Sequence, residues 1–332
     1  MSLTSSLKDL DSPMSRFLAG HLPGVAALIG SYRAQLPLRP DTLRPEGSGP
    51  FDYRGLGRAI DLRLRVAFGT PVGSPLTAGI DLAALDIARA ITLRAGLAAR
   101  AAGDELLSEL EAQQPAASGG AMRLADEAEV RLARLCFVAS HFEEVYREGL
   151  RPGNPLLQAD PARGLDGMLA QVPDYVPKDI GRLVDLADRP GALRWVLSVS
   201  GAGRVCGPTF GGSAHVGGAD ADFIAARHLI DCKATVHPHR QGRAELYQLA
   251  GYLLLDYDDL FRIDRISLYL ARQGMMIGWT SEEFLHLLGA RKPLAQLRAA
   301  CRTALSEPEA DPLRRTVPRQ NSHQQDSLFP DL

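Results

Sequence analysis

The apolar pattern of this 332-residue chain changes at about residue 150, and this change constrains the fold more than any other feature. Before it, from about residue 14 to 149, apolar residues recur at every third and fourth position with few β-branched runs, which predicts a series of amphipathic helices. The clearest helix is expected at 123–148. Its apolar stripe consists of Leu132, Leu135, Val138, Phe142 and Val145.

After residue 151 the predicted elements are shorter and alternate between strands and helices. In chain order we expect a helix at 178–189, a strand at 193–201, two strands around a short turn at 219–235, a helix at 241–257, a strand at 265–272 and a helix from 281. This alternation predicts an α/β core at 151–306, with the helical region 1–150 packed on it. The polar, proline-containing tail at 307–332 is expected to be flexible.

Composition excludes several classes of protein. The chain has 37 basic and 39 acidic residues, so any nucleic-acid contact must be local rather than a property of the whole surface. The four cysteines form no CxxC or Cys/His pair, which argues against a zinc knuckle or a disulfide framework. Without a signal peptide or an apolar run of about 20 residues, we expect a cytoplasmic protein with no membrane partner.

The stretch "GGADADFIAARHLIDCKAT", residues 217–235, has the pattern of a hairpin with charged ends. If Ile224 and Leu229 are the last pair before the turn, Asp222 lies directly opposite Asp231. Because side chains alternate along a strand, Asp220 shares a face with Asp222, and Lys233 shares a face with Asp231. Three carboxylates and one ammonium group are therefore expected on one patch.

Two carboxylates at that distance are both ionised at neutral pH only if a cation lies between them. Mg²⁺, held by one or two carboxylates and several waters, meets this need, and a neighbouring lysine can orient the attacking water. The simpler alternative is a surface ion pair between Asp231 and Lys233. The apolar residues beside both carboxylates favour buried strands instead, where an unused charge is costly.

Asp222, a short turn, "LIDCK" and then a helix reading "ELYQLAGYLLLD" together resemble the PD-(D/E)XK nuclease superfamily, and in particular its RecB/Cas4-like branch. In that branch the acidic hairpin is followed by a helix that carries QxxxY, and Gln248 and Tyr252 supply this motif. Their spacing places both side chains on one helical face. The resemblance covers about residues 205–280 and implies a restriction-endonuclease-like core, a mixed central sheet flanked by helices.

By this resemblance Asp222 and Asp231 would be metal ligands, with the backbone carbonyl of Cys232 as a third. Lys233 would be the catalytic lysine, and Gln248 and Tyr252 would position the substrate or the lysine. The sequence departs from the family at Ala221, where relatives carry proline before the first aspartate. Two further ligand positions stay open. Asp220 could replace Asp222, and the glutamate that many relatives carry on a preceding helix could be Glu143 or Glu144.

Other signals are weaker. His237, His239, Arg240 and Arg243 follow the lysine strand and are candidates for phosphate contacts, the alternative being a polar loop. The cysteine spacing predicts no iron–sulfur cluster. The glycine-rich residues 201–218 could suggest a Rossmann-type nucleotide site, but Pro208 and the glycines that follow it prevent a helix from beginning there, so no nucleotide cofactor is expected.

We therefore expect a Mg²⁺- or Mn²⁺-dependent nuclease, endo- or exo-acting, with DNA as the substrate and a role in defence or repair. The alternative is an inactive nuclease-fold module that serves nucleic-acid binding or protein interaction in a larger assembly. The sequence leaves open RNA as the substrate, homodimer formation, and association with a motor or sensor protein.

Overall fold

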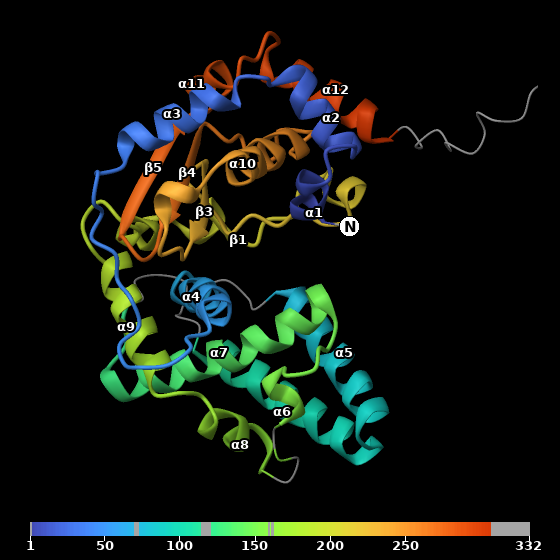
Figure 1. The fold of residues 1–332 in the computed structure, drawn as a ribbon, viewed down its shortest axis with the longest axis vertical. Coiled ribbons are helices and arrows are strands. Elements are labelled where there is room, and N and C mark those ends of the chain that lie inside the picture. The colour runs from blue at the N-terminus through green and yellow to red at the C-terminus, as the bar shows by residue number, and fades with distance from the viewer. Residues whose placement is uncertain (1, 70–72, 114–120, 159, 161–162, 307–332) are drawn as a thin grey trace, which may run out of the picture.

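The structure, a computed structural model, describes residues 2–69, 73–113, 121–158, 160 and 163–306. Figure 1 shows a sheet with helices on both sides, so that the protein belongs to the α/β class. The tail predicted at 307–332 lies outside the described residues. Within the described part, none of the helices combines the length and apolar character needed to cross a membrane.

The central sheet has five strands in the order β1-β2-β3-β4-β5. All neighbouring strands are antiparallel except β3 and β4, which are parallel and joined by helix α10. The sheet is therefore mixed. The strands are β1 (Arg204–Cys206), β2 (Phe223–Ala225), β3 (His228–Lys233), β4 (Arg265–Leu270) and β5 (Met275–Thr280).

Twelve α-helices are found in the described residues, nine of them before the sheet begins and three within or after it. They are α1 (Leu3–Lys8), α2 (Pro13–His21), α3 (Val25–Gln35), α4 (Tyr53–Ala67), α5 (Ser74–Ala90), α6 (Leu93–Ala112), α7 (Asp126–Glu148), α8 (Gly164–Ala170), α9 (Tyr175–Ala187), α10 (Arg243–Leu255), α11 (Ser281–Leu287) and α12 (Leu294–Ser306).

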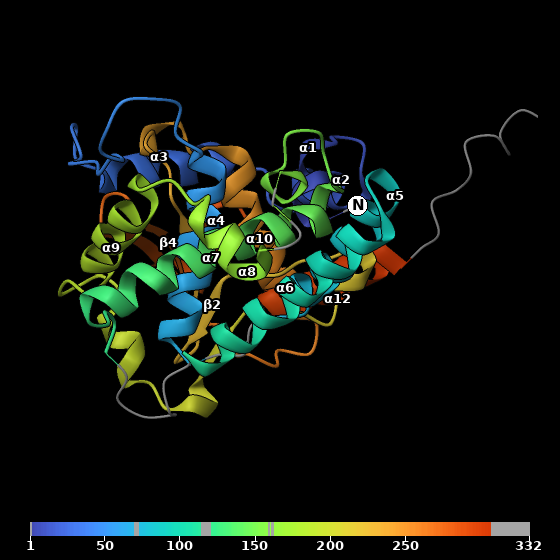
Figure 2. The same cartoon turned by 90° about the horizontal axis from the view of Figure 1, so that it is seen from below.

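Each face of the sheet is covered by its own hydrophobic core. Alternate residues of β2 and β3 point to opposite faces: Phe223 and Ile230 join the core formed with α4 to α9, whereas Ile224 and Leu229 join the core formed with α1 to α3 and α10 to α12. Figure 1 shows α4 between the sheet and α7, and Figure 2 shows α5 and α6 side by side on the same layer. Residue 150 is not a boundary between these cores, because α1 to α3 pack with the later helices.

Most of the elements expected from the sequence are present. The five apolar residues expected on one stripe of α7 are all buried, and α9, α10, β4 and α11 lie where the sequence predicts them. The strand expected at 193–201 is wrong, since Arg194–Ser198 forms a 3-10 helix. There Trp195 stacks on His228 at 5.6 Å, so the segment contacts the sheet through side chains instead of pairing with it. Strand β5 was not predicted.

Candidate active site

The hairpin of β2 and β3 has the register that the sequence predicts. Ile224 pairs with Leu229, but the last pair before the turn is Ala225 with His228, one pair later than expected. The turn residues Ala226 and Arg227 have φ values of 47° and 68°, the two positive values of a two-residue hairpin turn. The register is unchanged by this correction, because both pairs belong to the same ladder.

Asp222 lies just before β2 and turns its carboxylate toward β3. Its Oδ2 accepts a hydrogen bond of 2.6 Å from the backbone N–H of Cys232, which lies between Asp231 and Lys233. Its own backbone carbonyl accepts from the N–H of Gly207 at 2.9 Å. The hairpin thus holds Asp222 at the end of β3, as expected from the register.

Asp231 and Lys233 point to the same side of β3, and Lys233 Nζ lies 2.7 Å from Asp231 Oδ2. The Asp231 side chain is only 3% exposed, which rules out the interpretation of this pair as a surface ion pair. Burial lowers the pKa of Lys233, but the charges of Asp231 and Asp222 outweigh it, so the net pKa is raised and the ammonium group stays protonated.

Helix α10 adds the other two predicted residues through a chain of hydrogen bonds. Lys233 Nζ donates to Gln248 Oε1 at 2.9 Å, Gln248 Nε2 donates to the Tyr252 hydroxyl at 2.8 Å, and that hydroxyl donates to the carbonyl oxygen of Asp220 at 2.9 Å. Asp220 therefore accepts its hydrogen bond through its backbone carbonyl. Burial and the charges of Asp231 and Asp222 raise the pKa of Tyr252, and the charge of the Asp220 carboxylate adds to them. Gln248 and Tyr252 fix the position of the lysine.

Two residues of α4, Asp61 and Arg65, complete the charged cluster and were missed in the sequence. Arg65 Nη2 lies 2.7 Å from Asp61 Oδ2 and 4.0 Å from Asp222 Oδ1. The pKa of Asp222 is raised well above its usual value, first by burial and then by the negative charges of Asp61 and Asp231. The only local signal was an Asp and an Arg at i and i+4, which is common on helices and carries no specific meaning.

Of the two glutamates that the sequence left open, Glu143 is the one directed toward this cluster. It is 2% exposed, and its Oε1 has no hydrogen-bond partner. Burial lowers the pKa of Arg65, but the charges of Asp61 and then of Glu143 raise it. Glu144 instead forms an ion pair with Arg58 at 3.3 Å. Packing of α7 against α4 makes this choice.

The four residues predicted to contact phosphate follow the end of β3 along the chain. His237, His239 and Arg240 are exposed on a short loop that contains the 3-10 helix Pro238–Arg240, and Arg243 begins α10 with its guanidinium 5.0 Å from the ring centre of Tyr247. None of the four takes part in the hydrogen-bond chain described above. His237, His239 and Arg240 are therefore open to solvent at this end of the strand, whereas Arg243 is half-buried against Tyr247.

A metal ion bound at this cluster would have to be one that takes only one or two ligands from the protein. In the described part of the chain no group of three or more His, Cys, Asp or Glu side chains is arranged to hold a metal ion. Mg²⁺ needs only one or two carboxylates because it keeps several waters. Asp222 and Asp231 can supply these, and the buried Asp61 Oδ1 and Glu143 Oε1, both without hydrogen-bond partners, can accept from such waters.

Comparisons with models of protein families, with curated proteins and with solved structures give no significant match for this chain.

Proposed function

We propose that this protein is a Mg²⁺- or Mn²⁺-dependent nuclease that hydrolyses phosphodiester bonds in DNA. The observation that carries the proposal is the convergence of Asp222, Asp231, Lys233, Gln248 and Tyr252 in one hydrogen-bonded cluster. These are the residues for which the resemblance to the PD-(D/E)XK superfamily implies a role. The mixed sheet with helices on both faces is compatible with the restriction-endonuclease-like core that the same resemblance implies.

A metal ion bound by Asp222, Asp231 and the Cys232 carbonyl would polarise the scissile phosphate and lower the pKa of an attacking water. Lys233 is then placed to orient that water and to stabilise negative charge that develops on the phosphate. Gln248 Oε1 accepts a hydrogen bond from the ammonium group, at 2.9 Å, and helps to hold it in position. The side chains at 237–243 offer contacts to the flanking phosphates.

The second candidate is a nucleic-acid-binding or protein-interaction module with an inactive nuclease fold. The ion pair between Lys233 and Asp231 favours it, because a carboxylate that is satisfied by lysine needs no metal. Burial raises the pKa of both Asp222 and Asp231, and carboxylates with such raised pKa values gather at functional sites, which weighs against it.

The decisive experiment compares four proteins: wild type, Asp231→Asn, Lys233→Met and Lys178→Met. Lys178 is an exposed lysine on α9 and provides the matched control for the change at Lys233. Mn²⁺ binding is measured by isothermal titration, and cleavage is followed on labelled single-stranded and duplex DNA. Folding of each variant is checked by circular dichroism at the assay temperature.

We expect Asp231→Asn to lose both metal binding and cleavage, Lys233→Met to keep metal binding but lose cleavage by at least about 100-fold, and Lys178→Met to behave as wild type. Wild-type protein that binds no Mn²⁺ with DNA present would rule out the nuclease and favour the binding module. Cleavage that persists in folded Lys233→Met would rule out the assigned role of the lysine.

A further inference from the structure

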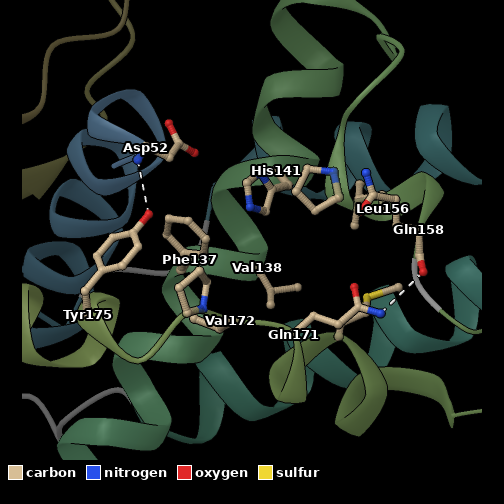
Figure 3. A pocket seen from close by; sticks show the side chains of 12 residues that line it. Asp52, Phe137, Val138, His141, Leu156, Gln158, Gln171, Val172 and Tyr175 are labelled. Carbon is tan, nitrogen blue, oxygen red and sulfur yellow. Dashed lines mark hydrogen bonds between the residues drawn. The ribbon is translucent and has the colours of Figure 1, made fainter. Parts of the chain in front are cut away.

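A cavity of about 460 Å³ lies away from the charged cluster, between the start of α4, the middle of α7 and the segment around α8. Figure 3 shows Phe137, Val138 and His141 of α7 in the middle of its lining, with Tyr175 to one side and Gln171 and Leu156 to the other. Its volume is in the range of pockets that hold small organic ligands, and like them it combines apolar walls with a few polar groups.

His141 is the feature of this cavity that the fold does not explain. Its side chain is 6% exposed, its ring packs edge-on against Phe137 with the ring centres 4.8 Å apart, and its buried Nδ1 has no hydrogen-bond partner. The nearest acid, Glu144, is 3.9 Å from that nitrogen and already pairs with Arg58. The protein covers Nδ1 completely, so a ligand in the cavity would meet the His141 ring through its edge or its other nitrogen, Nε2.

The other polar groups of the wall define what such a ligand must offer. The Tyr175 hydroxyl accepts a hydrogen bond of 3.1 Å from the N–H of Asp52, which leaves its own proton to donate. The Gln171 amide donates to the carbonyl of Gln158 at 3.3 Å, which leaves its oxygen to accept. Asp52 adds the carboxylate oxygen Oδ2, since its Oδ1 accepts from the N–H of Gly55 at 2.8 Å. Among the described residues that line the cavity, none is Lys or Arg, so a phosphate or carboxylate ligand would find no counter-charge.

We propose that this cavity binds an uncharged, planar heteroaromatic ring with an exocyclic amino group, the chemistry of an adenine, cytosine or guanine base. The aromatic rings of Phe137, His141 and Tyr175 offer faces and edges for a flat ring. Asp52 and the Gln171 oxygen accept from the amino group, and His141 and the Tyr175 hydroxyl complete the hydrogen bonds to the ring nitrogens. Free nucleosides and nucleic-acid strands both present such a base, and the experiment below distinguishes them.

The proposal does not depend on phosphodiester cleavage. Asp52 caps α4, and Asp61 of the charged cluster lies nine residues further along the same helix, about 13 Å away. The two sites thus share α4 and α7 but use different residues. Loss of one site in a folded variant leaves the residues of the other in place.

The test uses adenosine and AMP as free ligands, and two single-stranded DNA oligomers that differ only by one adenine or an abasic position. Binding is measured by isothermal titration to wild type, His141→Phe, Gln171→Leu and His21→Phe. His141→Phe keeps the aromatic ring and removes both nitrogens, whereas Gln171 is exposed, so that its change spares the fold. His21, on α2 in the other core, provides the same change away from the cavity.

We expect saturable binding of adenosine that is stronger than that of AMP and weakened about tenfold in both cavity variants but not in His21→Phe. If adenosine fails but the adenine oligomer binds more tightly than the abasic one, and His141→Phe removes the difference, the base comes from a strand. The proposal is overturned if neither probe shows saturable binding, or if binding is the same in wild type and in both cavity variants.

Discussion

The buried pair of Asp231 and Lys233 leads to a stability prediction that can be worked out from the structure. Lys233→Met keeps most of the side-chain volume but removes the cation 2.7 Å from a carboxylate that is 3% exposed. Removing one partner of a buried ion pair costs about 3–5 kcal/mol of folding free energy. We therefore expect a large loss of stability at neutral pH.

This cost has an upper limit, because Asp231 can bind a proton instead of holding an unpaired charge. For a carboxyl with a pKa of about 3.9 in the unfolded chain, neutralisation costs about 4 kcal/mol at pH 7 and about 1.5 kcal/mol at pH 5. In the variant the folded state then binds a proton that the unfolded state lacks. Its stability relative to wild type must therefore fall as the pH rises from 5 to 7.

The assay is urea unfolding at pH 5 and pH 7, with EDTA present so that no metal replaces the lysine. The free energy of unfolding is compared for wild type, Lys233→Met and the double variant Asp231→Asn/Lys233→Met. We expect the single variant to lose about 3–4 kcal/mol at pH 7 and about 1.5 kcal/mol at pH 5. The double variant, which has no buried charge to neutralise, should recover most of this loss at pH 7.

Two results would refute this reasoning. One is a single variant that loses less than about 1 kcal/mol at both pH values, which is the range of an exposed ion pair. The other is a double variant that is no more stable than the single one at pH 7, since the loss would then come from packing. Lys178→Met, at an exposed position, should stay within about 0.5 kcal/mol of wild type.

Three further predictions concern α4, the start of β3 and the packing of α5. If the proposed metal site exists, Asp61→Asn should lower Mn²⁺ affinity or DNA cleavage by about 10- to 100-fold, because Asp61 would hold Arg65 and metal-bound water in place. Unchanged affinity in titration calorimetry together with an unchanged cleavage rate would contradict this. Burial lowers the pKa of His228 to about 4, so the stability that its neutral form contributes is present above about pH 6.5 and is lost as the pH falls toward 4. Wild type should therefore lose free energy of unfolding between pH 8 and pH 5, and His228→Gln should reduce this loss by about 1–2 kcal/mol in urea unfolding. The exposed control His239→Gln should leave the loss unchanged. Gly79→Ala would place a Cβ against the backbone carbonyl oxygen of Phe142 in α7 and should lower the melting temperature. Gly30→Ala, with nothing within 4 Å, should raise stability by up to about 1 kcal/mol. Equal melting temperatures for the two variants would show that α5 does not pack closely on α7.

Much of the candidate site could be predicted from the sequence because its geometry is local. Side chains alternate along a strand, which places Asp231 and Lys233 on one side of β3. Residues four apart share a helical face, which brings Gln248 to Tyr252 at 2.8 Å. The hairpin register followed from the short connection between β2 and β3, so that the position of Asp222 was predicted although the turn itself was placed one pair too early.

The tertiary structure alone decided which distant side chains join these residues. Asp61 and Arg65 reach Asp222 only because α4 packs beside the end of β3, and no local pattern of the sequence encodes that contact. The choice of Glu143 over Glu144 likewise depends on the rotation of α7 against α4, since neighbouring residues on a helix point about 100° apart.

The same distinction explains the errors in secondary structure. The apolar residues at 193–201 have strand propensity, but in the fold Arg194–Ser198 forms a 3-10 helix that packs on β3 through Trp195 instead of pairing with a strand. Helix and hairpin patterns are thus fixed by interactions within a few residues, and the sequence by itself determined them. How α4 and α7 pack against the sheet depends on the burial of two hydrophobic cores. Because the residues of each core lie far apart along the chain, only the folded structure reveals this packing.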